Sequence, residues 1–473
     1  MLQDKTSIQR EIFIQPLLDI NEDIELSLVL HYDTPEKKGK LTELGYTNRT
    51  VRLYPKSRFT RVAQPYSISM PATTWFYGRE DVLETVGDNL RFGNNHDTSM
   101  IVYGLKRTGK TSVVKRLIQY TLRTHGYNTT HLPIYTDLLL YPQVKEIKTE
   151  GDFLYFLIEI IVSELTDVEW QISLPFDLPE VREEFYYQPF KAFSTRLKEI
   201  LQALAGRHLI LVLDEFSTLY ENSIQPKEDI ALTPRLFAFL SNTIQSMHQL
   251  TFIFTGTYLL LGMMSTYMYD LAKICFPLMI NFLDDTSARQ LVTEPVKSNE
   301  SDPNNGWLEY DSRVVDRIVT YTNRHPYLIQ YLCMQVVNRM NILKYPHVNL
   351  VDIDSIIHDI IFVSANETVM LNLWNDFGAS QQKVLSAIAA QTNPNHDGVE
   401  VSNIAAIFKE LGEPISLENI DAICASLADA ELLEKVTSAS YQSQSYKITI
   451  PLYHYWLKQN KPLRSLLGKR AMH

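Results

Sequence analysis

The chain has 473 residues, 45% of them hydrophobic and 21% charged, which is the composition of an ordinary globular protein with roughly two to four domains. Its formal net charge of −11 excludes a global field that draws the protein to nucleic acid or anionic lipid, although a local basic patch remains compatible. No apolar run approaches the roughly 18 residues of a membrane span, and the first residues do not resemble a signal peptide. We therefore expect a cytoplasmic protein with no membrane partner and with three buried free thiols: Cys275, Cys333 and Cys424.

Residues 1–65 are predicted to form a β-leaning, basic N-terminal extension. The run at 24–30 mostly alternates apolar and polar residues, which is typical of a half-buried strand. From Lys37 to Arg61 the segment contains eight basic residues and one acid, Glu43. Two interpretations stay open: a segment that holds a partner or nucleic acid, and a solvated hairpin, which we favour.

A P-loop lies at residues 104–111, where Gly-Leu-Lys-Arg-Thr-Gly-Lys-Thr fits the pattern G-x-x-x-x-G-K-[ST]. An apolar run at 99–103 predicts a strand before it, and apolar residues at helical spacing predict a helix after it. We expect Lys110 to reach the β- and γ-phosphates of ATP or ADP and the Thr111 hydroxyl to ligate Mg²⁺. The residues of this loop that we expect to contact nucleotide are Gly104, Arg107, Thr108, Gly109, Lys110, Thr111 and Ser112.

A second landmark is the buried strand predicted at 208–213, which ends in Asp214 and Glu215. Ligands of open α/β sheets bind at the carboxyl ends of the strands, so both acids are expected beside the P-loop. Asp214 is predicted to order Mg²⁺. Glu215 is predicted to activate the attacking water as a general base. Further strands are expected at 132–138, 250–257 and 276–282.

The pattern becomes helical from residue 285. Helices are predicted at 285–298, 311–322, 326–342 and 351–361, which form a lid over residues 285–365 that follows an ATPase core at 66–284, with 64–71 as a linker. Residues 366–473 add a bridging helix at 366–378, three helices at 381–390, 402–411 and 416–431, two strands at 432–436 and 445–450, and a basic tail. Three helices followed by a two-stranded wing predict a winged-helix domain. Its third helix has four acids and no Lys or Arg, so we favour contact with protein over DNA readout.

The order of P-loop, acidic strand end, polar strand end, helical lid and winged helix resembles the STAND and AAA+ ATPases, near the archaeal ATPase family and the origin-recognition ATPases. The resemblance covers roughly residues 66–460 and implies an α/β P-loop fold with a doubly wound, mostly parallel sheet. It implies that Phe76, Gly78 and Arg79 line the adenine pocket. It also implies that Thr255, or else Thr257, senses the γ-phosphate or catalytic water.

The lid of the family carries a Gly-x-Pro turn whose proline lies against the nucleotide. The turn at 323–326 resembles it and implies the same role for Pro326, although Asn323 and Arg324 replace the usual glycines. Arg324 would then read the γ-phosphate from the lid. Arg235 is a candidate arginine finger acting on a neighbouring copy.

These features favour a slow, Mg²⁺-dependent ATPase switch for signalling or defence, in which nucleotide controls the lid, self-assembly or an effector protein. The alternative is a DNA-associated AAA+ ATPase of the replication-initiation or transposition type. The acidic third helix and the net charge favour the first, and the basic segments keep the second open. A scaffold that does not hydrolyse ATP is disfavoured because Glu215 is present.

Overall fold

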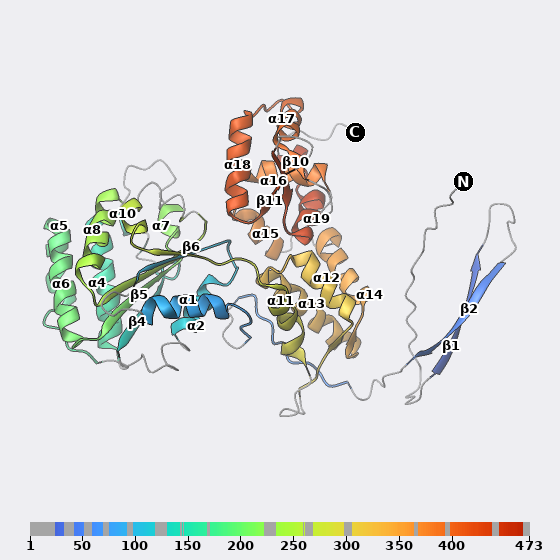
Figure 1. Ribbon diagram of the computed structural model, residues 1–473, viewed down its shortest axis with the longest axis horizontal. Helices are drawn as coiled ribbons and strands as arrows, with labels where there is room; N and C mark the ends of the chain where they lie inside the picture. Colours follow the sequence, from blue (N-terminus) through green and yellow to red (C-terminus); the bar gives the residue numbers. More distant parts are fainter. Residues whose placement is uncertain are drawn as a thin grey trace.

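The computed structural model describes residues 24–32, 42–51, 59–69, 75–91, 98–118, 130–141, 144, 146–167, 171–221, 233–258, 260, 268–297, 305–363, 368–392, 398–437 and 444–466. Figure 1 shows an α/β unit, a helical lid (residues 284–363), a C-terminal unit (residues 368–466) and a separate N-terminal hairpin. The hairpin pairs β1 (Ile24–Tyr32) with β2 (Thr42–Val51) in antiparallel register. Most of the predicted basic segment, from Lys37 to Lys40 and from 52 to 58, lies outside the described residues, as does the tail beyond 466.

The α/β unit is built on a five-stranded parallel sheet in the order β4-β5-β6-β3-β7. Its strands are β3 (Met100–Tyr103), β4 (His131–Asp137), β5 (His208–Asp214), β6 (Leu250–Gly256) and β7 (Phe276–Met279). The last strand is shorter than the predicted 276–282, because β7 pairs with β3 only from Phe276 to Met279. The predicted doubly wound P-loop fold is confirmed.

Helices cover both faces of this sheet, as the alternation of side chains in β5 requires. Leu209, Leu211 and Leu213 pack in the core with α4 (Glu150–Thr166), α5 (Leu178–Tyr187), α6 (Pro189–Ala203) and α8 (Pro234–Ser246). Ile210 and Val212 pack on the other face with α1 (Glu80–Arg91) and α2 (Lys110–Arg116). Because β6 lies between β3 and β5, the P-loop, the end of β6 and the end of β5 meet at one edge (Figure 1).

The lid consists of α11 (Asp285–Thr293), α12 (Ser312–Thr322), α13 (Pro326–Leu343) and α14 (Leu350–His358), close to the predicted bounds. Two short strands, β8 (Glu309–Tyr310) and β9 (His347–Val348), pair in parallel between them. Side chains cap the starts of α11 and α14: the Asp284 side chain accepts from Ser287 N, and Asn349 forms a capping box with Asp352.

The C-terminal unit has the predicted three helices and strand pair. These are α16 (Ala379–Gln391), α17 (Val401–Glu410), α18 (Leu417–Asp429), β11 (Leu433–Thr437) and β12 (Gln444–Ile448), preceded by α15 (Thr368–Asn375) and joined by β10 (Val399–Glu400). Two further helices, α19 (Pro451–Asn460) and α20 (Leu463–Leu466), have no predicted counterpart. Pro451 at the first turn of α19 was the available signal for its start.

The lid and the C-terminal unit share one continuous hydrophobic core. It runs from Ile318 of α12 and Val336 of α13 to Leu427 of α18 and Trp456 of α19, all fully buried. The α/β unit has its own two cores, one on each face of the sheet. The lid and the C-terminal unit are therefore packed directly against each other through this core.

Residues 59–69 are not a free linker. The backbone of Val62 exchanges hydrogen bonds with the Asn341 side chain (2.9 and 3.0 Å), and Ser67 N donates to Gln330 Oε1 (3.3 Å). The Tyr66 hydroxyl donates to Val292 O (2.6 Å). The segment is therefore fixed along α13 before the chain enters the α/β unit.

All three cysteines are free and buried, as predicted. Of the helices in the described ranges, none is both long and apolar enough to cross a membrane.

Candidate nucleotide-binding site

The P-loop has the backbone geometry that its glycines allow. Gly109 precedes α2 with φ 101°, a left-handed conformation that disfavours a side chain. A Cβ atom at Gly104 would collide with the carbonyl oxygen of Ile280, which follows β7. The loop thus turns tightly between β3 and α2, and the positive end of α2 faces the space above it.

Lys110 lies buried inside this turn. Its Nζ donates to the carbonyl oxygens of Gly104 (3.3 Å) and Leu105 (3.0 Å). Burial lowers the pKa of the ammonium group, and the nearby carboxylates of Glu215 and Asp214 oppose that shift. The side chain is held within the loop, on the wall of the adjoining cavity, where a phosphate oxygen would be its natural partner.

Asp214 is fully buried at the end of β5 and accepts four hydrogen bonds. Its Oδ2 accepts from Thr111 Oγ1 (2.7 Å) and from the Tyr135 hydroxyl (2.6 Å). Its Oδ1 accepts from Glu215 N (3.1 Å) and from Thr255 Oγ1. The sequence predicts that Thr111 and Thr255 lie near Asp214, but it gives no signal for Tyr135.

Thr111 and Asp214 suit a magnesium ion. Both present oxygen atoms, the ligand that Mg²⁺ prefers, and they already lie within hydrogen-bond distance of each other. Mg²⁺ in nucleotide sites takes one or two protein ligands and completes its shell with phosphates and water. The described residues contain no cluster of three or more His, Cys, Asp or Glu side chains that would hold a metal by themselves. The donor set therefore fits a nucleotide-associated Mg²⁺.

Glu215 faces the cavity and has φ 56°, a conformation that is uncommon for a residue with a side chain. Because of this backbone conformation, the chain leaves the direction of β5 at Glu215, directly after Asp214. Burial raises the pKa of its carboxyl group, with a lowering contribution from Lys110. Its amide also donates to Thr255 Oγ1 (3.1 Å), so Thr255 orients the Asp214–Glu215 pair. Thr255 is fully buried and does not line the cavity. Its contact with a γ-phosphate therefore stays a prediction.

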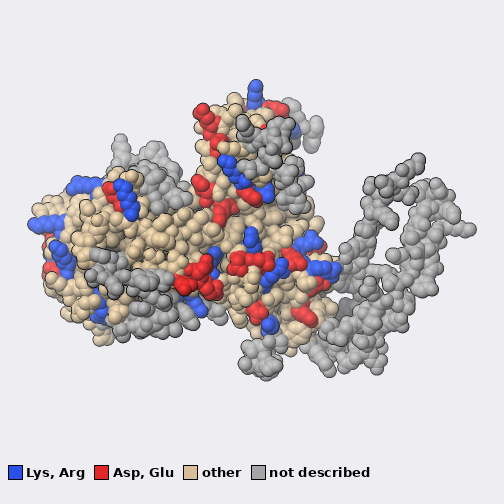
Figure 2. Space-filling model, viewed as in Figure 1, with Lys and Arg blue, Asp and Glu red and all other residues tan. Residues whose placement is uncertain are grey.

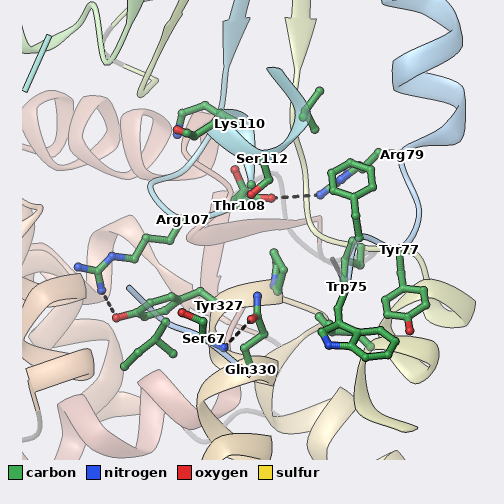
Figure 3. A pocket seen from close by; sticks show the side chains of 18 of the residues that line it. Ser67, Trp75, Tyr77, Arg79, Arg107, Thr108, Lys110, Ser112, Tyr327 and Gln330 are labelled. Atoms are coloured by element: carbon green, nitrogen blue, oxygen red, sulfur yellow. Dashed lines mark hydrogen bonds between the residues drawn. The ribbon is translucent and has the colours of Figure 1, made fainter. Parts of the chain in front are cut away.

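A cavity lies between the α/β unit, the lid and residues 67–69. Figure 3 shows its two ends: Lys110, Thr108 and Ser112 lie at one, and Trp75 and Tyr77 lie at the other. The two aromatic rings are stacked with centroids 6.5 Å apart. The full lining is Ser67, Ile68, Ser69, Trp75, Phe76, Tyr77, Arg79, Arg107, Thr108, Gly109, Lys110, Thr111, Ser112, Val113, Glu215, Leu283, Leu291, Pro326, Tyr327 and Gln330.

The predicted adenine-pocket segment is at this cavity. Phe76 and Arg79 line it. Gly78 does not, but a Cβ atom there would meet the Ser287 hydroxyl at 2.6 Å, so this glycine permits α11 to approach. The Arg79 guanidinium donates to the carbonyl oxygens of Asn281 and Phe282, and burial lowers its pKa. Arg79 thus ties the chain after β7 to the cavity wall.

The lid reaches the P-loop through Tyr327. Arg107 donates to the Tyr327 hydroxyl (2.6 Å), and its guanidinium carbon lies 4.4 Å from the centre of the same ring. The contact of Pro326 with nucleotide stays a prediction, but the residue lines the cavity. Arg324 does not: its guanidinium donates to Asn323 Oδ1 (3.3 Å), and its carbonyl accepts from Leu283 N (3.1 Å). Of the described arginines, those that line the cavity are Arg107, within the P-loop, and Arg79, which donates to Thr108 O (3.5 Å).

Sequence reasoning missed several lining residues. Ser67 and Ser69 fell in the predicted linker, and Gln330 lies one helical turn beyond Pro326. Tyr327 directly follows Pro326, and Trp75 and Tyr77 flank Phe76. Their position next to predicted site residues is the signal that could have identified them. Arg235, the candidate arginine finger, stacks on Phe190 with its guanidinium carbon 4.5 Å from the ring centre, and its role stays a prediction.

Comparison with known proteins places the fold. No protein-family model matches the chain, and no curated protein matches it in sequence. Among solved structures, the Aeropyrum pernix ORC2 protein, determined as ADPNP–ADP complexes, aligns over 86% of this chain and 98% of its own, with a TM-score of 0.57 and 11% identity. The two proteins share a fold.

Two other solved structures align less well. The Aeropyrum pernix ORC1 protein in complex with DNA covers 83% of this chain and 94% of its own, at 15% identity and a TM-score of 0.41. The Thermotoga maritima RuvB Holliday junction branch migration motor covers 79% and 97%, at 13% identity and a TM-score of 0.39.

Proposed function

We propose that this protein is an ATPase of the AAA+ type that binds ATP with Mg²⁺ in the cavity between the α/β unit and the lid. The observation that carries the proposal is Asp214, which joins the P-loop hydroxyl of Thr111 to the backbone of Glu215 through hydrogen bonds to its two carboxylate oxygens. One buried carboxylate thus connects the phosphate-binding loop to the candidate general base.

The residues divide the chemistry as follows. The aromatic end of the cavity, with Trp75 and Phe76, receives the base. Lys110 and the backbone N–H groups of the loop neutralise the phosphates. Thr111 and Asp214 would hold Mg²⁺, which supplies charge neutralisation and orientation of the β- and γ-phosphates when bound. Glu215 accepts a proton from the water that attacks in line.

The C-terminal unit is proposed to be a winged-helix domain that moves with the lid. Arg107 and Lys106 of the P-loop contact Tyr327 and Asp376, respectively, so the nucleotide phosphates would lie beside both contacts. ATP and ADP differ by one phosphate at this point. Nucleotide state would therefore shift the position of the lid and the C-terminal unit relative to the sheet, and with it the assembly of copies.

Of the two roles that the sequence left open, the DNA-associated one is now the better supported. One solved structure with the same fold is an ORC protein, and the sequence itself resembles the origin-recognition ATPases. Nucleic acid is therefore no longer disfavoured as a partner, and signalling or an effector protein becomes the second candidate.

Helix α18 is not suited to bind in a DNA groove, because Glu418 and Asp429 are exposed on it and would repel the phosphates. The face shown in Figure 2 also gathers acids over α1, where Glu80 and Asp81 are exposed. The basic segment near residues 37–61 and the basic tail from Lys458 through Arg470 are the proposed contacts.

Steady-state ATP hydrolysis tests the enzyme, with Lys110→Ala and Glu215→Gln as variants. Lys110→Ala is expected to abolish nucleotide binding, whereas Glu215→Gln is expected to keep binding and lose at least about 100-fold in turnover. Hydrolysis that survives Glu215→Gln would remove the general-base assignment. Light scattering with ADP and with ATP, each with and without duplex DNA, tests the role. Salt-sensitive DNA binding supports the DNA-associated role, and ATP-dependent assembly without DNA supports the signalling role.

A further inference from the structure

Among the described residues, Tyr135 is the one donor to the Asp214 carboxylate that lies outside the P-loop, the Asp214–Glu215 segment and the end of β6. It lies on β4, where the register pairs Tyr135 with Val212 and Asp137 with Asp214. Its phenol therefore reaches forward along the sheet edge to Asp214 Oδ2, at 2.6 Å.

The geometry of the Asp214 carboxylate gives this contact a specific consequence. A carboxylate has about four lone-pair sites, and Asp214 uses two donors on each oxygen. Oδ1 is held by Thr255 and the Glu215 amide. Oδ2 is the oxygen next to Thr111, and Tyr135 is the other donor on it. Tyr135 thus fixes the direction of the oxygen that would face a cation bound by Thr111.

The ring of Tyr135 is held independently of its hydroxyl. It packs against the core formed with α1 and α2, and Lys115 Nζ of α2 lies 4.8 Å from the ring centre. A phenylalanine keeps both contacts and removes only the hydrogen bond. The substitution therefore isolates the effect of the phenol on Asp214.

We propose that Tyr135 is a positioning residue that orients the Asp214 carboxylate toward the divalent cation of bound nucleotide. This inference rests on the proposed function, because it requires that Thr111 and Asp214 hold such a cation. Residues that orient metal ligands through hydrogen bonds typically contribute 10- to 100-fold to metal affinity. Loss of the phenol is expected to weaken cation binding by at least about 10-fold and to leave metal-free nucleotide binding unchanged.

The test uses Mn²⁺ as a spectroscopic probe. The full chain is saturated with a non-hydrolysable ATP analogue, and Mn²⁺ binding is followed by electron paramagnetic resonance for the wild type and Tyr135→Phe. Analogue affinity in EDTA is measured in parallel. Tyr155→Phe is the matched control, since that hydroxyl donates to Leu178 O (3.4 Å) on α5. The expected result is weaker Mn²⁺ binding in Tyr135→Phe alone, with equal affinity for the analogue in EDTA.

Two results would overturn the inference alone: wild-type Mn²⁺ affinity in Tyr135→Phe, or an equal loss of analogue affinity in EDTA, which indicates a structural role. A wild-type protein that binds the analogue but no Mn²⁺ would contradict the proposed function itself and this inference with it. The wild-type titration therefore separates the two failures.

Discussion

Lys106 Nζ lies 3.2 Å from Asp376 Oδ1, and this ion pair joins the P-loop directly to the turn between α15 and α16. The two side chains are 31% and 19% exposed, so solvent screens the pair only in part. Lys106 is three residues from the loop glycine that precedes Lys110. Bound phosphates would therefore compete with Asp376 for the same ammonium group.

Asp376→Asn is expected to tighten ATP binding by about two- to five-fold, because it removes a negative charge near the phosphates and frees Lys106. Fluorescence titration with a labelled ATP analogue measures the change. The gain should shrink at roughly 1 M salt, where the screening length is about 3 Å. Glu413→Gln is the matched control, since it breaks the Lys383–Glu413 pair (2.7 Å) within the C-terminal unit. Equal changes in both variants would argue against a specific role of Asp376.

His325 predicts a dependence of stability on pH. It precedes α13 and is fully buried between Phe282 and Tyr327. Burial, followed by the charge of Arg107, lowers its pKa from 6.5 to about 3. The unfolded chain therefore takes up the proton first as pH falls. Stability that is present above pH 6.5 is lost between pH 6.5 and about 3.

His325→Phe removes this loss, because the variant has no imidazole at this position to protonate. The free energy of unfolding of the variant, relative to wild type, should rise by up to about 1.4 kcal/mol for each pH unit below 6.5. Chemical denaturation at several pH values measures it. His358→Gln, at an exposed site, serves as control. A constant difference between wild type and His325→Phe at every pH would contradict the assignment.

Gly104→Ala is expected to destabilise the chain by about 1–3 kcal/mol or more and to weaken ATP binding, because the new methyl group would strike the Ile280 carbonyl. Gly206→Ala is the comparison, since Gly206 has φ 90° but open space around its Cβ position. Both variants carry backbone strain, and only Gly104→Ala adds a collision. Thermal unfolding should therefore show the larger loss for Gly104→Ala, and equal losses would mean that strain alone matters.

The shared core of the lid and the C-terminal unit predicts coupled unfolding. Trp456→Ala removes a fully buried side chain and is expected to cost about 3–5 kcal/mol. Hydrogen exchange should then increase in α13 of the lid as well as in α16. Phe237→Ala, in the core of the α/β unit, should increase exchange in α4 and α6 and leave α13 protected. Independent protection of α13 in Trp456→Ala would show that the two units unfold separately.

The fold was predictable because its signals are local. The P-loop glycines, the apolar run before Asp214 and the helical spacing after residue 285 each occupy one continuous segment. The contacts that complete the site are not local: Tyr135 and Asp214 are 79 residues apart, and Ser67 meets Gln330 across 263 residues. Sequence spacing contains no information about such pairs.

Arg324 shows a second limit. The sequence predicts that Arg324, two residues before the lid proline Pro326, points toward the nucleotide. The structure keeps the two residues close in the chain, but the Arg324 side chain does not line the cavity. Its direction depends on Asn323 and Arg324, which both have left-handed backbones with φ 46° and 63°. No composition rule predicts two such residues in succession when neither is glycine. Arg107 of the P-loop lines the cavity, whereas Arg324 of the lid does not.

Residues 59–69 are hydrogen-bonded along α13, although the next elements of the chain belong to the sheet. A load applied to the β1–β2 hairpin would therefore reach the lid before it reaches the P-loop strand. A partner bound to that hairpin would therefore act on the lid, which lines the cavity, without contacting the nucleotide.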